Sequence, residues 1–198
     1  MAKGLDCGTS YYITATEDSM KKQRNVFLTV DGDAGQVKRM LKRQSIPFVE
    51  KAGKVHIVGQ HAFNYAQIFS TTELKRPMSS GLLNPKEKDA LPVLNAIIGE
   101  LLGKGKKDEV CVYCVPANPI DQTRDVSYHE DVLKPIIEGY GYDVKVVEES
   151  IALAYEGLVD NDLTGIAISM GAGMCNVCVM YQGMSSLSFS VARGGDWV

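Results

Sequence analysis

The sequence predicts an α/β protein of one or two domains. Three observations support this: the chain opens with a β-meander, continues with alternating strands and helices, and begins a second meander near residue 165. Its 198 residues, 45% of them hydrophobic, are enough to build a substantial core. The formal net charge of −3 gives no reason to expect nucleic acid as the main partner, because proteins that bind nucleic acid are usually strongly basic.

The first 60 residues predict mainly strands. Residues 3–16 read as a strand, a tight Gly-Thr-Ser turn and a second strand, and residues 25–32 as a third strand that ends in a turn. Residues 34–43 predict a helix, because their apolar side chains fall on one face. Two short strands, 46–51 and 54–59, flank an Ala-Gly turn.

The middle of the chain alternates between helices and strands. A helix follows Pro85, because leucine and isoleucine recur at helical spacing as far as Gly103, which can end it. Pro92 lies inside this stretch and either kinks the helix or delays its start. The remaining predicted elements are a strand over 109–116 buried on both faces, a helix from Val126 to Gly139, a strand over 143–149, a helix over 150–158, and two or three strands over 165–192.

No apolar run approaches the ~20 residues of a membrane span, and the amino terminus lacks a signal-peptide core. We therefore expect a cytoplasmic protein, whose five cysteines are free thiols. The cations Lys38, Arg39, Lys42 and Arg43 could touch a membrane or another anionic surface, but a solvated helix face explains them better.

Two Cys-x-x-Cys pairs imitate a four-cysteine zinc site: Cys111 with Cys114, and Cys175 with Cys178. Each pair falls in a predicted strand, where residues three apart point to opposite faces. A zinc site needs both thiolates of a pair on a turn, so we expect no zinc here and interpret the cysteines as small apolar residues of a sheet core.

Two glycine-containing bends, in LDCGTS and SMGAGM, each join two apolar strands. Small residues at such bends let backbone N–H groups point into one concavity, which is the arrangement that binds phosphate. Asp6 ends the first strand beside its bend, where a carboxylate can hold a magnesium ion through water. Either bend alone is better explained as an ordinary hairpin.

Taken together and in order, the motifs resemble the actin–Hsp70–sugar-kinase ATPase superfamily. LDCGTSYYI resembles its first phosphate loop, VVEESIALAYEGL its connecting helix, ISMGAGMCNVCVM its second phosphate loop, and ARGGDWV the Gly-Gly-Asp that follows. The segments KVHIVGQHA, LKRPMSSGLL and VCVYCVPA are most similar to the bacterial actin MreB and related actin-like proteins. The resemblance covers nearly the whole chain.

The resemblance implies a ribonuclease-H-like fold, with a mixed five-stranded sheet flanked by helices and with ATP and Mg²⁺ held between two lobes. Residues 1–157 would form the first lobe, with a small insertion subdomain over about 32–84. Residues 158–198 would begin a second lobe that looks cut short.

Site residues follow position by position from the resemblance. Asp6 matches the acid of the first loop and Glu149 the connecting-helix glutamate, which helps to position the attacking water. The matching phosphate-loop positions are Gly8, Thr9, Ser10, Gly171, Ala172, Gly173 and Met174. Phosphoryl transfer depends mostly on positioned water, metal and backbone dipoles, which agrees with this set of residues. By the dipole rule alone, Glu149 is only an acid at a helix start.

Three positions depart from the superfamily pattern. Ser169 stands where an acid is usual, Met174 where a hydroxyl is common, and Asn176 where an acidic residue is expected. Losing the acid at Ser169 removes a group that would orient metal-bound water. We therefore expect nucleotide binding with slow or altered hydrolysis.

The first functional hypothesis is a filament-forming cytoskeletal ATPase that self-associates head to tail. The alternative is an Hsp70-related, nucleotide-gated module that binds partner proteins without polymerising. A small-molecule kinase ranks third, because no residue stands out as its substrate acid or base. Shared fold does not decide among them.

Overall fold

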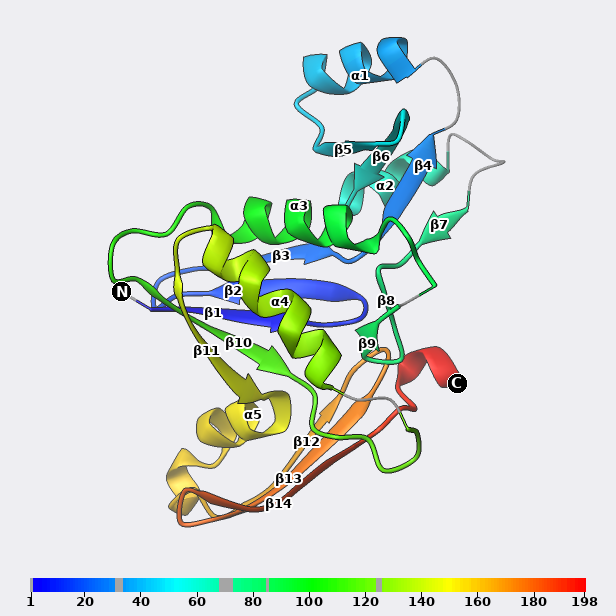
Figure 1. The fold of residues 1–198 in the computed structure, drawn as a ribbon. Helices are drawn as coiled ribbons and strands as arrows, with labels where there is room; N and C mark the ends of the chain where they lie inside the picture. The colour runs from blue at the N-terminus through cyan, green and yellow to red at the C-terminus, as the bar shows by residue number, and fades with distance from the viewer. Residues whose placement is uncertain (1, 31–33, 68–72, 85, 124–125) are drawn as a thin grey trace.

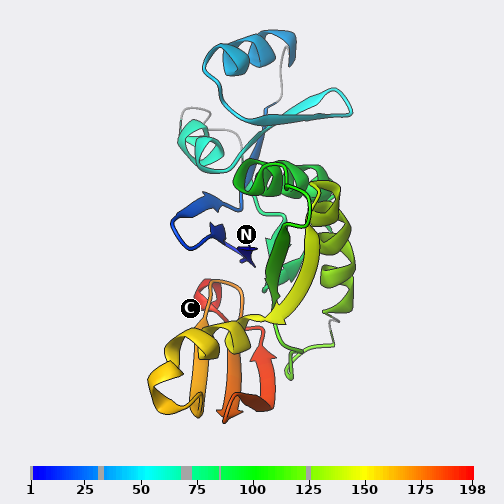
Figure 2. The ribbon, with the colours of Figure 1, turned by 90° about the vertical axis from the view of Figure 1, so that its left-hand side faces the viewer.

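The computed structural model describes residues 2–30, 34–67, 73–84, 86–123 and 126–198. Four sheets organise the chain: a central five-stranded sheet, a four-stranded sheet above it, a three-stranded sheet below it, and a two-stranded hairpin (Figure 1). The five-stranded and three-stranded sheets lie one after the other along the molecule, and the helices α3 and α4 lie on one side of the five-stranded sheet (Figure 2).

The five-stranded sheet is mixed, as predicted, with the order β11-β10-β1-β2-β3. β1 is parallel to β10 and β10 to β11, whereas β2 is antiparallel to both of its neighbours, β1 and β3. The strands are β1 Ala2–Cys7, β2 Tyr11–Ala15, β3 Met20–Arg24, β10 Val110–Val115 and β11 Asp143–Glu148. The sequence analysis missed β3, whose residues MKKQR are polar because it is the solvated edge strand.

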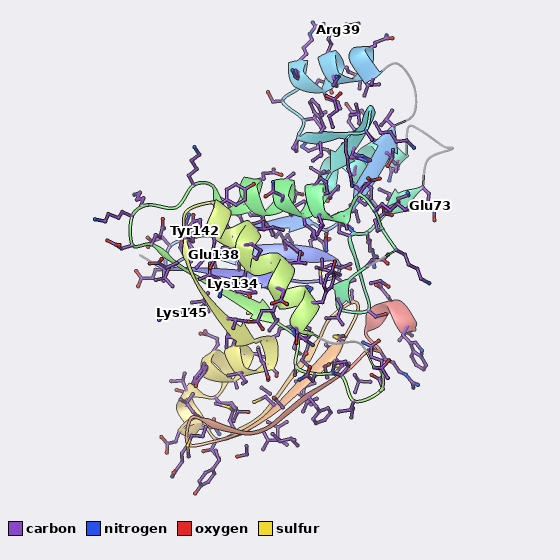
Figure 3. All side chains as sticks on the ribbon, in the orientation of Figure 1. Arg39, Glu73, Lys134, Glu138, Tyr142 and Lys145 are labelled. Atoms are coloured by element: carbon purple, nitrogen blue, oxygen red, sulfur yellow. The ribbon has the colours of Figure 1, made fainter. Side chains whose placement is uncertain are left out.

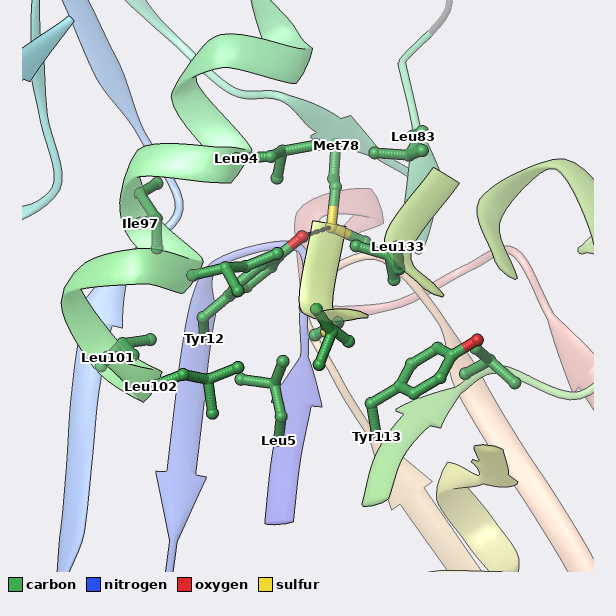
Figure 4. Close-up of a cluster of buried hydrophobic side chains, with 14 of the residues drawn as sticks. Leu5, Tyr12, Met78, Leu83, Leu94, Ile97, Leu101, Leu102, Tyr113 and Leu133 are labelled. Atoms are coloured by element: carbon green, nitrogen blue, oxygen red, sulfur yellow. Dashed lines mark hydrogen bonds between the residues drawn. The ribbon is translucent and has the colours of Figure 1, made fainter. Parts of the chain in front are cut away.

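Helices α3 (Ala90–Leu102) and α4 (Ser127–Gly139) pack on one face of this sheet. The core between them includes Tyr12, whose hydroxyl donates to the Met78 sulfur at 3.2 Å (Figure 4). α3 ends at Gly103, as predicted. Pro92 is its third residue and costs little there, because first-turn N–H groups have no acceptor within the helix.

The prediction that β10 is buried on both faces was wrong. Cys111, Tyr113 and Val115 are buried under the helices, whereas the alternate residues, among them Cys114, are only half-buried. Cys114 lines a cavity on the opposite face of the sheet. The strand therefore has one core face and one face open to that cavity.

A four-stranded sheet of order β5-β6-β4-β7 forms the upper part of the molecule. Its elements are β4 Phe27–Val30, α1 Ala34–Arg43, β5 Phe48–Lys51, β6 Lys54–Val58, α2 Gln60–Ala66 and β7 Leu74–Lys75. α1 has the predicted bounds, whereas the predicted end of β4 at Asp31 and Gly32 lies outside the described residues. The sequence analysis missed α2 and the two-residue strands β7, β8 (Met78–Ser79) and β9 (Leu82–Leu83), which are too short to show a period.

The basic residues of α1 differ in exposure: Arg39, Lys42 and Arg43 are exposed, and Lys38 is half-buried. Arg39 is exposed and points away from the rest of the molecule (Figure 3). Lys38 pairs with Glu50 at 2.9 Å. Among the described residues, no helix has the length and apolar character needed to cross a membrane.

The three-stranded antiparallel sheet has the order β12-β13-β14. Its strands are β12 Gly165–Met170, β13 Cys175–Tyr181 and β14 Met184–Val191, which settles the predicted "two or three" strands at three. α5 (Glu149–Gly157) packs on one face of this sheet and also contacts β10 and β11, so it joins the two sheets. Short 3₁₀ turns follow at Val159–Asn161 and Gly195–Trp197.

The cysteine pairs lie in strands, as predicted. Cys111 and Cys114 are in β10, with Cys111 buried and Cys114 on the other face. Cys175 and Cys178 are in β13, where Cys178 packs against α5 and Cys175 faces away from it.

Candidate phosphate-binding site between two hairpins

The turns of the β1–β2 and β12–β13 hairpins line one cavity of about 170 Å³. All the site residues expected from the sequence line it: Asp6, Gly8, Thr9, Ser10, Glu149, Gly171, Ala172, Gly173 and Met174. These residues come from chain segments about 160 positions apart, and the fold brings them together. Their roles stay predictions.

Each hairpin is closed by one backbone hydrogen bond from a glycine. Gly8 N–H donates to the carbonyl of Tyr11 at 3.0 Å, and Gly171 N–H donates to that of Met174 at 2.9 Å. The turn residues between them, Thr9 and Ser10 in one hairpin and Ala172 and Gly173 in the other, have backbone N–H groups without a hydrogen bond in the described part of the chain. Such N–H groups are the donors that an anion needs.

A third hairpin, β8–β9, meets both of these turns. The Gly81 N–H donates to the buried Thr9 hydroxyl oxygen at 3.0 Å. A Cβ on Gly173 would lie 2.3 Å from both the Gly81 nitrogen and that hydroxyl oxygen, so only glycine fits there. The sequence analysis quoted this segment within LKRPMSSGLL but missed Gly81 as a lining residue; its Ser-Gly turn was the available signal.

Met174, which stands where superfamily members often carry a hydroxyl, is part of the main core. Its side chain is 3% exposed and packs under the β8–β9 turn, where a Cβ on Gly81 would lie 2.3 Å from its sulfur. Gly81 has a φ of +77°, a conformation that glycine adopts without strain. The side chain at this position therefore supports the hairpin by packing.

Asp6 is a half-buried carboxyl that lines the cavity. Burial, and next the nearby Glu149 carboxylate, raise the pKa of Asp6 to about 6. Within the described residues its carboxylate has no hydrogen bond and no ion pair. Since an ionised carboxylate is costly to bury unpaired, this environment suits a divalent cation as its partner.

Glu149, the first residue of α5, has hydrogen bonds to both carboxylate oxygens. The Ser169 hydroxyl donates to Oε1, and the Asn176 side-chain amide donates to Oε2 at 3.0 Å. The other end of the Asn176 amide accepts from the Ala117 N–H at 3.1 Å. The sequence analysis treated Ser169 and Asn176 only as lost acids and missed their contact with Glu149, which depends on how α5 packs on the second sheet.

Within the part of the chain that the structure describes, no Lys or Arg lines this cavity. Lys75 lies 3.7 Å from Glu87, and Arg76 pairs with Asp196 beside a larger cavity of about 570 Å³. The two cavities share Ala172 and Gly173, so the second hairpin turn separates them.

These residues fit a magnesium-bound phosphate. Four backbone N–H groups without a hydrogen bond in the described part of the chain can donate to an anion. Asp6 provides an unpaired carboxylate for the metal. Among the described residues, two carboxylates and no cationic side chain line the cavity, so a divalent cation would offset the charge of a bound phosphate.

A family model described as Volactin matches residues 1–198 of the chain. The chain belongs to the volactin family. No curated protein sequence is significantly similar to this volactin.

Solved structures show that the volactin chain has the actin-like fold. A MamK double helical filament is similar with a TM-score of 0.69 and 18% identity, over 98% of this chain and 55% of MamK. MreB5 of Spiroplasma citri bound to ADP is similar with a TM-score of 0.65 and 15% identity, over 99% of this chain and 53% of MreB5. A non-polymerising MamK mutant bound to AMPPNP has a TM-score of 0.59, with 18% identity over 98% of this chain and 55% of the mutant. The volactin chain therefore spans about half the length of these proteins.

Proposed function

We propose that this volactin is a cytoplasmic actin-like protein that binds Mg²⁺-ATP between its two hairpins and assembles into filaments. The convergence of the two hairpin turns, Asp6 and Glu149 on one cavity supports the proposal most strongly. Similar proteins are nucleotide-bound in their solved structures, with ADP in MreB5 and AMPPNP in MamK.

The residues have distinct tasks in this proposal. Backbone N–H groups of both turns bind the terminal phosphates, and Asp6 holds the magnesium ion through water. Magnesium, when bound, neutralises phosphate charge and polarises the bond to be broken. Glu149 orients a water molecule toward the terminal phosphate. We expect slow or altered hydrolysis, because Ser169 and Asn176 stand where superfamily members usually carry acids.

Self-association is supported by the relatives. One similar structure is a MamK double helical filament, and another is a MamK mutant described as non-polymerising, so assembly is a property of that protein. For this chain we propose head-to-tail contacts favoured by the ATP-bound state. No residue of the described chain favours the Hsp70-related alternative over this one.

We propose the domain division expected from the sequence: a first lobe over 1–157 with an insertion over about 32–84, and the start of a second lobe over 158–198. The separate sheets support it, although β4, which begins at Phe27, belongs to the insertion's sheet.

A nucleotide titration with a pelleting assay tests the proposal. We expect binding of ATP only with Mg²⁺, because the cavity has no cationic side chain, and sedimentable polymer with Mg²⁺-ATP but not with EDTA. Equal ATP binding in EDTA would contradict the proposed site. Monomers at high concentration with bound Mg²⁺-ATP would favour the non-polymerising alternative.

A further inference from the structure

Two neutral hydrogen-bond donors, the Ser169 hydroxyl and the Asn176 side-chain amide, hold the Glu149 carboxylate. Ser169 is the penultimate residue of β12 and Asn176 is the second residue of β13, and the two are directly paired across these strands. Both side chains point to the α5 face and donate to Glu149, one to each oxygen. The contact is therefore bidentate and sets the plane of the carboxylate.

The donors are themselves fixed. Asn176 is 1% exposed, and its oxygen accepts from the Ala117 N–H, so its amide cannot rotate without losing a buried hydrogen bond. Ala117 belongs to the segment after β10, which is joined to β14 through the Ser190 hydroxyl at 2.7 Å from the Ala117 carbonyl. The carboxylate orientation is thus tied to the junction between the two sheets.

We propose that Ser169 and Asn176 are positioning residues that hold the Glu149 carboxylate with its free lone pairs toward the phosphate cavity, to orient the attacking water. The inference rests on the proposed function. A carboxylate that accepts two hydrogen bonds keeps one lone pair on each oxygen for another donor, such as water. Neutral donors also avoid the repulsion that acidic side chains would cause against Glu149.

A substitution at Ser169 distinguishes two explanations of this residue: a lost metal-orienting acid, or a donor that holds Glu149. If Ser169 is only a lost metal-orienting acid, then Ser169→Asp should raise the rate of hydrolysis. If Ser169 holds Glu149, then Ser169→Asp removes a donor, puts a second carboxylate against Glu149 and lowers the rate. Thr and Val provide a matched pair, since they have nearly the same shape and suit a strand equally well but only Thr keeps the hydroxyl.

The first experiment measures the side-chain carboxyl resonance of Glu149 in the absence of nucleotide. In the protein labelled with ¹³C at glutamate side-chain carboxyls, Glu149→Gln assigns the Glu149 resonance. We expect this resonance to move in Ser169→Val and in Asn176→Asp, and to keep its wild-type position in Ser169→Thr. The Asp variant retains the oxygen that accepts from Ala117, loses the donor to Glu149 and places a second carboxylate against it. A Val variant with an unchanged resonance would overturn the proposal.

The second experiment measures kcat and KM for the hydrolysis of Mg²⁺-ATP. We expect Ser169→Val and Ser169→Asp to lower kcat for Mg²⁺-ATP by at least about tenfold with little change in KM, because misplacing a group that orients the nucleophile affects the transition state more than ground-state binding. Ser169→Thr should restore kcat. A rise of kcat in Ser169→Asp would overturn the positioning role. A wild-type protein that binds no Mg²⁺-ATP would instead contradict the proposed function, while the resonance still decides whether Ser169 and Asn176 hold Glu149.

Discussion

The two hairpins of the candidate site differ in the charge of their side chains and in the helices that cover their sheets. The β1–β2 hairpin carries the half-buried acid Asp6 and lies in a sheet covered by α3 and α4. The β12–β13 hairpin carries the neutral Ser169 and Asn176, and among the described residues its sheet is covered by α5 on one face alone. The acid that suits a metal therefore belongs to one hairpin, and the donors that orient Glu149 belong to the other.

This division of roles teaches that similar backbone turns do not imply similar chemistry. Both turns offer free N–H groups to phosphate. The side chains that flank them decide whether the turn brings a cation or orients a carboxylate. Each prediction below tests one side of the comparison.

Asp6→Asn should have the largest effect, because it removes the charged group that we propose for the metal. We expect the affinity for Mg²⁺-ATP to fall by at least about 100-fold. Isothermal titration of both proteins with Mg²⁺-AMPPNP measures this. Unchanged affinity in a folded variant would move the metal site away from the first hairpin.

The same substitution should stabilise the nucleotide-free protein in a pH-dependent way. The folded-state pKa of Asp6, about 6, lies above its ordinary value of 3.8, so folding is penalised once Asp6 ionises. The wild type therefore loses stability as pH rises from about 4 to about 6, and Asp6→Asn does not. The shift corresponds to an advantage of up to about 3 kcal/mol for the variant at pH 7, vanishing near pH 4. Urea unfolding at several pH values measures it; a difference that does not change with pH would contradict the burial of an ionised Asp6.

Gly173→Ala tests the contact between the hairpins. The added Cβ would overlap the Gly81 nitrogen and the Thr9 hydroxyl, so we expect a loss of about 1–3 kcal/mol in stability. Gly4→Ala is the matched control, because a Cβ on Gly4 would have its nearest neighbour at 3.9 Å. Thermal unfolding of both variants compares them, and equal melting temperatures would mean that the turns do not meet as described.

A substitution on the face of the β12-β13-β14 sheet that α5 does not cover should have the smallest of these effects. Ile166, Ile168, Met170 and Leu187 on β12 and β14 are each more than half exposed. Apolar surface of this kind favours association. We expect the 198-residue chain to associate without nucleotide, and Ile168→Ser to weaken this roughly tenfold, by about 1.5 kcal/mol.

Sedimentation equilibrium without nucleotide measures this association. Ser186→Ala, on an exposed polar residue of β14, is the control. An Ile168→Ser chain that associates as strongly as the wild type would show that the open face is not the contact.

Patterns local in the chain allowed most of the fold to be predicted. The apolar periodicity of residues 34–43 predicted α1 with its observed bounds, and Gly103 marked the end of α3. The edge strand β3 was missed because a solvated edge needs no apolar alternation. The burial of β10 was predicted wrongly, because an apolar composition does not show that one face borders a cavity.

The sequence by itself determined the two glycine hairpins, the acid beside the first and the glutamate that opens α5, because turn chemistry and helix starts depend on neighbouring residues. Only the tertiary structure decided that Gly81 contacts Thr9, that Met174 packs beneath it, and that Ser169 and Asn176 hold Glu149. Those contacts join residues separated by 20 to 93 positions. They follow from how the sheets and α5 pack, which local patterns do not encode.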